Sequence, residues 1–142
     1  MPGYRVPTIV FLSLLSLALP ASADETTDSI RKVISSQIAA FIDEDASKAF
    51  SFAAPALQKR FGDPRVFVEM VRKSYGAILR PGAYAFGKSH VDDDKSHAFQ
   101  VVLISEPDGK EWAALYEMER QTDGRYAISG VRIMRDSVSK GI

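Results

Sequence analysis

The sequence predicts an α+β domain in which N-terminal helices pack on a curved antiparallel sheet of four strands. The first observation is a change of period. Apolar residues recur every three or four positions up to about residue 80, and every second position after residue 82. The second is a pair of Asp-Gly dipeptides, at Asp108 and Asp123, that separate the last three alternating runs and indicate hairpin turns. Helices first and strands afterwards is the order of an α+β domain.

The helices are predicted over residues 24–45, 46–53, 55–61 and 64–78. Asp45 and Asp63 are placed to cap the second and the fourth of them, and Gly62 ends the third. The first helix carries an apolar stripe of Ile30, Val33, Ile34, Ile38, Phe41 and Ile42, and the last carries one of Val66, Phe67, Met70, Val71, Ser74, Tyr75 and Ile78.

The strands are predicted from Tyr84 to Val91 and over residues 97–106, 111–120 and 125–135. Glycine in mid-strand usually marks a bulge or a close approach, and Gly130 interrupts the alternation of the last strand. A bulge there keeps four apolar side chains on the inner face: Tyr126, Ile128, Val131 and Ile133.

The second strand is apolar on both faces at its centre. Phe99, Val101 and Leu103 share one face, and Val102 and Ile104 share the other. A sheet covered by helices on one side needs only one apolar face, so we expect partial cover on the outer face as well. A homodimer through this face would provide the cover, and scattered surface aliphatic residues are the alternative.

The N-terminus has the form of a signal peptide. Arg5 supplies a positive charge, residues 6–19 are mostly apolar, and Ala21-Ser22-Ala23 predicts cleavage before Asp24. The apolar run is shorter than the roughly 20 residues that span a bilayer, although an uncleaved anchor is the alternative. The prediction is therefore a signal peptide over residues 1–23, a single domain over 24–142, no membrane span after cleavage, and a periplasmic or secreted product.

The composition excludes several classes of protein. The 142 residues contain 18 Lys and Arg and 18 Asp and Glu, and loss of Arg5 with the signal leaves a net charge of −1. A chain this neutral is a poor general binder of nucleic acid. Because cysteine is absent, disulfides, thiolate chemistry and Cys-based zinc sites are excluded. We expect no cofactor.

The known catalytic and metal motifs are missing as well. The sequence has no Gly-x-Ser-x-Gly elbow, no His-Glu-x-x-His, no phosphate-binding loop and no Gly-x-Gly-x-x-Gly. His90 and His97 flank three consecutive aspartates, a set that could hold a divalent ion. Consecutive turn residues point in different directions, however, so we interpret this stretch as a solvated hairpin tip and predict no metal site.

The order of elements resembles the cone fold of the nuclear-transport-factor-2-like superfamily. More narrowly, the chain is similar to a bacterial family called domain of unknown function 4864, over about residues 28–135. The segments that carry this are Ile30-x-x-Val33-Ile34-x-x-Gln37, Asp45-x-x-x-Ala49-Phe50-x-Phe52-Ala53-x-Pro55, Phe67-x-x-Met70-Val71-x-x-x-Tyr75 and Tyr116 through Val131. The resemblance implies a fold and no activity, so it carries over no catalytic residue.

Six residues are candidates for lining a ligand pocket inside such a cone. They lie on faces that we expect to point inward, and they comprise Gln37, Phe41, Tyr75, Phe86, Trp112 and Tyr116. Aromatic residues with a polar tip line pockets well, and they are also ordinary core residues. The Gln37 amide could contact a ligand or a neighbouring backbone group.

The sequence therefore favours an exported, non-catalytic module that binds a small apolar ligand or an envelope protein. The first alternative is a small cofactor-free enzyme of the isomerase, dehydratase or hydrolase kind that uses the same pocket. Such chemistry needs a carboxylate base, and no Asp or Glu falls on a face that we expect to point inward. The second alternative is an assembly domain of an envelope complex that acts through its sheet.

Overall fold

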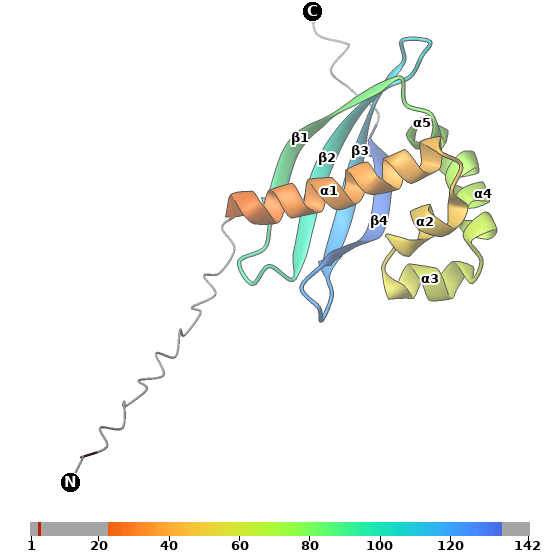
Figure 1. Cartoon of the computed structure of the whole chain (residues 1–142). Helices are drawn as coiled ribbons and strands as arrows, with labels where there is room; N and C mark the ends of the chain where they lie inside the picture. Colours follow the sequence, from red (N-terminus) through yellow and green to blue (C-terminus); the bar gives the residue numbers. More distant parts are fainter. Residues whose placement is uncertain (1–2, 4–22, 135–142) are drawn as a thin grey trace, which may run out of the picture.

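The computed structural model describes Gly3 and residues 23–134 of the chain. Helices come first and strands follow, which confirms the α+β prediction (Figure 1). In order, the elements are α1 (Ala23–Ile42), α2 (Ala46–Ser51), α3 (Pro55–Phe61), α4 (Pro64–Ser74), α5 (Gly76–Leu79), β1 (Ala83–Val91), β2 (His97–Ser105), β3 (Glu111–Arg120) and β4 (Tyr126–Met134). No helix within the described residues is long and apolar enough to cross a membrane. The predicted signal peptide lies outside them, apart from Gly3 and Ala23.

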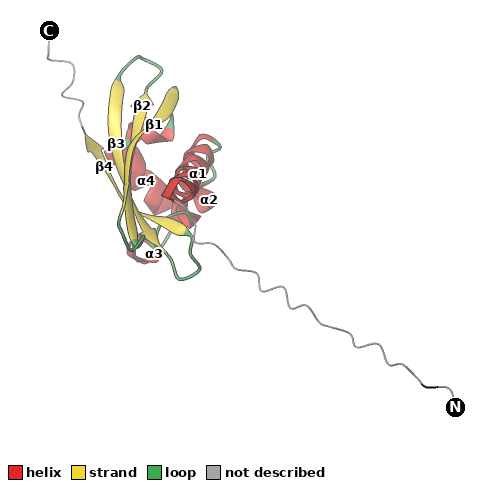
Figure 2. Ribbon diagram, turned by 90° about the vertical axis from the view of Figure 1, so that its left-hand side faces the viewer, coloured by secondary structure: helices red, strands yellow, loops and turns green. Residues whose placement is uncertain are grey.

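The four strands form one curved, unclosed sheet in the order β1-β2-β3-β4, with every neighbouring pair antiparallel. The helices lie on one face of this sheet and leave the other face bare (Figure 2). Helix α1 crosses the covered face, whereas α2, α3 and α4 gather on the β4 side (Figure 1). Within the described residues the cover is therefore one-sided, and the partial cover expected for the outer face is not supplied by these helices.

The two Asp-Gly dipeptides do form the last two turns, although only the glycines adopt a positive φ. Gly109 has φ +88° and Gly124 has φ +84°. The aspartates act through their side chains instead: the carboxylates of Asp108 and Asp123 accept hydrogen bonds from backbone N–H groups two residues later, each at 3.0 Å. Both turns thus combine an aspartate side-chain bond with a left-handed glycine.

The predicted caps are confirmed. Asp45 accepts a hydrogen bond from Lys48 N at 3.0 Å at the start of α2, and Asp63 accepts one from Arg65 N at 2.7 Å at the start of α4. The helix predicted over 64–78 is divided, because Tyr75 leaves the helical region with φ −141° and ψ 42°. Gly76 follows it, and glycine is a poor helix former, which favours a break at this point.

The core lies between α1 and the covered face of the sheet. Ile30, Ile34 and Ile38 of α1 are fully buried against inward residues of the strands such as Val102 and Ala114. Three residues of the predicted stripes are exceptions. Ile42 at the end of α1 is 55% exposed, Val66 in the first turn of α4 is 53% exposed, and Ser74 at the end of α4 is exposed as well.

A bulge interrupts β4 as the position of Gly130 predicted. Gly130 pairs with Glu117 and Ile128 pairs with Met118, so Ser129 is the extra residue, and its hydroxyl donates to Glu117 O at 3.1 Å. The four side chains expected to face inward, Tyr126, Ile128, Val131 and Ile133, all belong to or pack against the core.

A second bulge, in β1 between Phe86 and Ser89, is filled by a buried amide that the sequence analysis did not anticipate. Gln100 of β2 is fully buried. Its Nε2 donates to the carbonyls of Gly87 and Lys88, and its Oε1 accepts from Arg31 Nε of α1 at 3.2 Å. Gln100 therefore binds the irregular part of β1 to the helix layer.

Candidate functional site

A pocket of about 430 Å³ lies between α3 and α4 on one side and β3 and β4 on the other. This volume is within the range of small-molecule sites. The lining is mostly apolar and comprises Gln37, Phe41, Ala53, Leu57, Arg60, Phe61, Phe67, Met70, Val71, Ser74, Tyr75, Ile78, Tyr116, Ile128, Ser129, Gly130 and Val131.

Backbone hydrogen bonds join the helix side of the pocket to its strand side. Ala54 N donates to Ile128 O at 2.8 Å, and Ile128 N donates to Phe52 O at 2.9 Å, so the corner between α2 and α3 is bound to β4. The bulge at Ser129 follows directly. Beyond this point the strand contributes Ser129, Gly130 and Val131 to the pocket.

Tyr116 is the most deeply buried polar residue of the lining. Its side chain is fully buried, and its hydroxyl is the buried side-chain polar atom that has no hydrogen-bond partner within the described residues. Burial, and secondly the nearby Tyr84, raise the pKa of Tyr116 above its ordinary value near 10. The phenol therefore stays neutral at physiological pH and can donate or accept a hydrogen bond.

The remaining polar groups of the lining differ in whether the fold already uses their hydrogen-bonding capacity. Gln37 is buried, and its Nε2 donates to Ala49 O at 3.2 Å, so at least one side of the amide is used within the fold. Arg60 and Ser74 line the pocket and are exposed, which places them at its mouth. The Arg60 guanidinium lies over the Phe61 ring, 5.7 Å from its centroid.

The lining has no carboxylate and no imidazole among the residues that the structure describes. Its ionisable groups are the Arg60 guanidinium and the phenols of Tyr75 and Tyr116. Such a set can bind, orient and desolvate a ligand. It offers no ordinary general base to take a proton from one.

Four of the six predicted pocket residues meet here: Gln37, Phe41, Tyr75 and Tyr116. The other two point inward and lie elsewhere. Phe86 packs edge-on against Tyr84 and under the Arg31 guanidinium, and Trp112 Nε1 donates to Glu106 Oε2 at 2.7 Å. Both residues lie on strand positions of the inner face, but neither lines the pocket.

The lining residues that come from α3 and from the β4 bulge were not predicted from the sequence. Leu57 and Arg60 stand three residues apart on α3, and that spacing was the available signal for a helix face. Ser129 and Gly130 could not be assigned to a pocket from the sequence, because their place in the lining depends on how the helices pack against the sheet.

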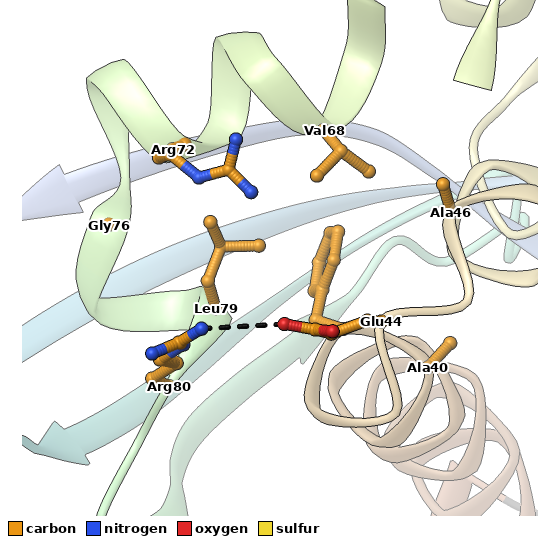
Figure 3. Close-up of a pocket in the computed structure, with 9 residues that line it drawn as sticks. Ala40, Glu44, Ala46, Val68, Arg72, Gly76, Leu79 and Arg80 are labelled. Atoms are coloured by element: carbon orange, nitrogen blue, oxygen red, sulfur yellow. Dashed lines mark hydrogen bonds and ion pairs between the residues drawn. The ribbon is translucent and has the colours of Figure 1, made fainter. Parts of the chain in front are cut away.

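A second depression, of about 620 Å³, lies where the end of α1 meets α4 and α5 (Figure 3). Its rim carries the ion pair Arg80–Glu44, with 3.4 Å between nitrogen and oxygen, and both side chains are largely exposed. Arg72, on the same rim, pairs with Glu69. Because its charges are paired and solvated, this depression is a weaker candidate than the pocket that contains Tyr116.

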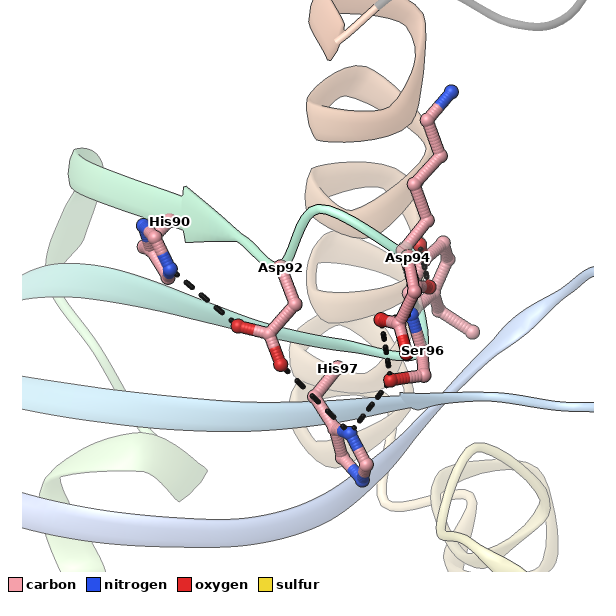
Figure 4. Close-up of polar contacts among 7 residues, drawn as sticks. His90, Asp92, Asp94, Ser96 and His97 are labelled. Atoms are coloured by element: carbon pink, nitrogen blue, oxygen red, sulfur yellow. Dashed lines mark hydrogen bonds and ion pairs between the residues drawn. The ribbon is translucent and has the colours of Figure 1, made fainter.

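The two histidines flank the turn between β1 and β2, His90 near the end of β1 and His97 at the start of β2 (Figure 4). Asp92 lies between them, with one oxygen 3.4 Å from His90 Nε2 and the other 3.9 Å from His97 Nδ1. Asp94 accepts hydrogen bonds from the hydroxyl and the backbone N–H of Ser96, which lowers the pKa of Asp94. Over the described part of the chain, no group of three or more His, Asp or Glu residues could hold a metal ion.

We expect the Tyr116→Phe variant to be more stable than the wild type, by about 1 kcal/mol in the free energy of unfolding, because it removes a buried hydroxyl without a partner. Urea unfolding followed by Trp112 fluorescence measures this. Tyr126→Phe is the matched control: its hydroxyl donates to Lys95 O at 2.6 Å, so its loss should cost about 1 kcal/mol. A destabilised Tyr116→Phe would show that the hydroxyl is bonded in the free protein.

The unfolding free energies of the wild type and of Tyr116→Phe should differ more at alkaline pH. The pKa of Tyr116 is raised in the fold, so the unfolded chain releases this proton first as the pH rises past about 10. The wild type then loses stability that Tyr116→Phe keeps. The difference between the two unfolding free energies should therefore widen above pH 10 and stay constant between pH 6 and pH 8.

Comparison with known proteins gives a family and no activity. No curated protein sequence matches the chain. Two solved structures from Catenulispora acidiphila are similar to it. One, in complex with S-DNPA, is 13% identical with a TM-score of 0.48, and the similarity covers 75% of this chain and 90% of that one. The other is 14% identical with a TM-score of 0.49, over 78% and 91% of the two chains.

The match to a family is much more extensive, since it covers residues 23–140 and thus all the helices and strands described above. The chain belongs to the family described as "Domain of unknown function (DUF4864)".

Proposed function

We propose that this protein is a module that binds a small, largely apolar molecule in the pocket between α3, α4 and the sheet. The observation that carries the proposal is Tyr116, a residue of the lining of a pocket of about 430 Å³, whose fully buried hydroxyl has no partner among the described residues. Leaving such a group unpaired costs about 1–3 kcal/mol. A ligand that bonds to it recovers this cost on binding.

Binding is favoured over catalysis by the composition of the lining. An isomerase or dehydratase of the cofactor-free kind needs a carboxylate or a histidine close to the reacting carbon. The described residues that line the pocket provide neither. The enzyme alternative would gain support if a bound ligand were found to be chemically changed on release.

The binding test uses N-phenyl-1-naphthylamine, a neutral probe that fluoresces in apolar sites. We expect it to bind the wild type, and Ser74→Trp to weaken binding at least fivefold, because a tryptophan at this exposed rim position blocks the mouth. Lys73→Trp is the matched control, since Lys73 is exposed on the same helix and does not line the pocket. Equal affinity in all three proteins would refute the pocket as the binding site.

We also propose that the domain acts after export, as a periplasmic or secreted protein. The support is the sequence pattern of residues 1–23, most of which lie outside the described residues. Ala23 and Asp24 are exposed at the start of α1, where a cleaved terminus would cost no buried contact. Intact mass spectrometry of the exported protein should give a chain that begins at Asp24. A chain that keeps residues 1–23 would contradict cleavage.

A second candidate role is self-association through the bare face of the sheet. The observation that favours it is an apolar row across all four strands, formed by the paired residues Ala85, Leu103, Ala113 and Met134. Leu103 is 50% exposed and Met134 is 39% exposed. Val101 and Leu115 pair beside this row and extend it. A second copy of the chain would cover this surface and bury it from water.

For self-association, Leu103→Arg should convert a dimer to a monomer, because it places a charge at the centre of the row. Light scattering after size exclusion measures the mass directly. Val66→Arg is the matched control: Val66 is similarly exposed, at 53%, and lies on α4 away from the bare face. A wild type that stays monomeric at every concentration tested would exclude this role.

A further inference from the structure

We infer that the ligand of the pocket is an apolar carboxylic acid whose carboxylate pairs with Arg60 at the mouth and whose uncharged hydrogen-bonding end reaches Tyr116 inside. This inference rests on the proposed function and specifies the chemical class of the ligand. Three features of the lining carry it: an unpaired cation at the rim, an unpaired neutral hydroxyl inside, and an apolar wall between them.

The rim carries a positive charge that the fold leaves available. Arg60 lines the pocket, and within the described chain it forms no ion pair with a carboxylate. Other exposed arginines nearby are paired, Arg65 with Asp63 and Arg72 with Glu69. The stacking of Arg60 over Phe61 holds its guanidinium at the pocket edge.

Charge also decides which ligands the pocket disfavours. A cationic ligand would meet Arg60 at the mouth and no carboxylate anywhere in the described lining. An anionic ligand would be attracted by Arg60 and would meet no carboxylate that repels it. Guanidinium groups bind carboxylates with two parallel hydrogen bonds, which orients the ligand as well as attracting it. The pocket therefore selects for a single negative charge.

The polarity of the ligand within the pocket follows from desolvation. A carboxylate at the inner end would be buried against one phenol and apolar side chains, which is costly without a counter-charge. At the mouth the same carboxylate stays partly hydrated. The charged end thus remains outside, and the inner end must be an uncharged acceptor or donor, such as a carbonyl or a hydroxyl.

Tyr116 suits a neutral partner because it stays protonated. Its hydroxyl is enclosed, so a ligand reaches it only when a side chain of the wall moves. Met70 is partly exposed in that wall, and a methionine side chain adopts several rotamers at low cost. The walls between the two polar ends are aliphatic and aromatic, including Val71 and Ile128, and they match an apolar ligand body.

The experiment measures competition against N-phenyl-1-naphthylamine by four probes. 4-Acetylbenzoate carries both polar ends. 4-Acetylbenzamide removes the charge, and 4-isopropylbenzoate removes the carbonyl at nearly constant shape. The biphenyl homologue of 4-acetylbenzoate extends the reach between the ends. Each is tested against the wild type, Arg60→Gln, Tyr116→Phe and, as the matched cation control, Lys59→Gln, because Lys59 is exposed on α3 and does not line the pocket.

We expect the better of the two acetyl acids to compete at least fivefold more strongly than the amide, and Arg60→Gln to abolish that preference. Lys59→Gln should leave it unchanged. Tyr116→Phe should weaken the acetyl acid about tenfold and leave 4-isopropylbenzoate unaffected.

The outcomes separate the inference from the proposed function. If N-phenyl-1-naphthylamine binds in a manner that Ser74→Trp blocks, and the acids compete no better than the amide, the carboxylic-acid class is wrong and the pocket stands. If the acids are preferred equally by the wild type and by Arg60→Gln, the assignment of Arg60 is overturned. If the neutral probe does not bind at all, the proposed function fails and the inference fails with it.

Discussion

Two hydrogen bonds between Ile128 of β4 and the corner that joins α2 to α3 attach the helices beside the pocket to the sheet. They run from Ala54 N to Ile128 O and from Ile128 N to Phe52 O, at 2.8 and 2.9 Å. Because the backbone of Ile128 is used in this way, α3 begins over one end of β4 and leaves the next residues uncovered. The bulge at Ser129 falls at that boundary. The pocket lies beside this attachment, between α3 and α4 on one side and β3 and β4 on the other.

The two most buried polar side chains of the sheet have different explanations. Gln100 is fully buried and fully engaged, since it donates to backbone carbonyls of the β1 bulge and accepts from Arg31. Its cost of burial is offset within the fold. Tyr116 is equally buried, and its hydroxyl has no such partner among the described residues. The Gln100 amide is satisfied within the fold and the Tyr116 hydroxyl, on the neighbouring strand, is not. This difference is the reason to look for a ligand that bonds to Tyr116.

Periodicity and turn chemistry were sufficient to predict the order of helices and strands, the four strands and the β4 bulge, because these depend on local sequence. The division of α4 from α5 at Tyr75 was missed, since no proline marks it and the apolar stripe continues through the break. For the site, inward-facing residues such as Gln37 and Tyr116 could be chosen from alternation. Which inward residues share a pocket could not be predicted, because Phe86 and Trp112 follow the same alternation and do not line the pocket, and the packing of the helices on the sheet is not a local property of the sequence.

Both bulges matter to the site through the register of the strands. In β3 the inner and outer faces alternate, so Tyr116 points to the pocket and Leu115 to the bare face. A slip of one residue would exchange these faces. The pairing Tyr116↔Val131 lies immediately beyond the Ser129 bulge, and the pairing Tyr116↔Gln100 joins it to the residue that fills the β1 bulge. Tyr116 therefore lies in the sheet between two irregular strands, on the inner face, where it lines the pocket.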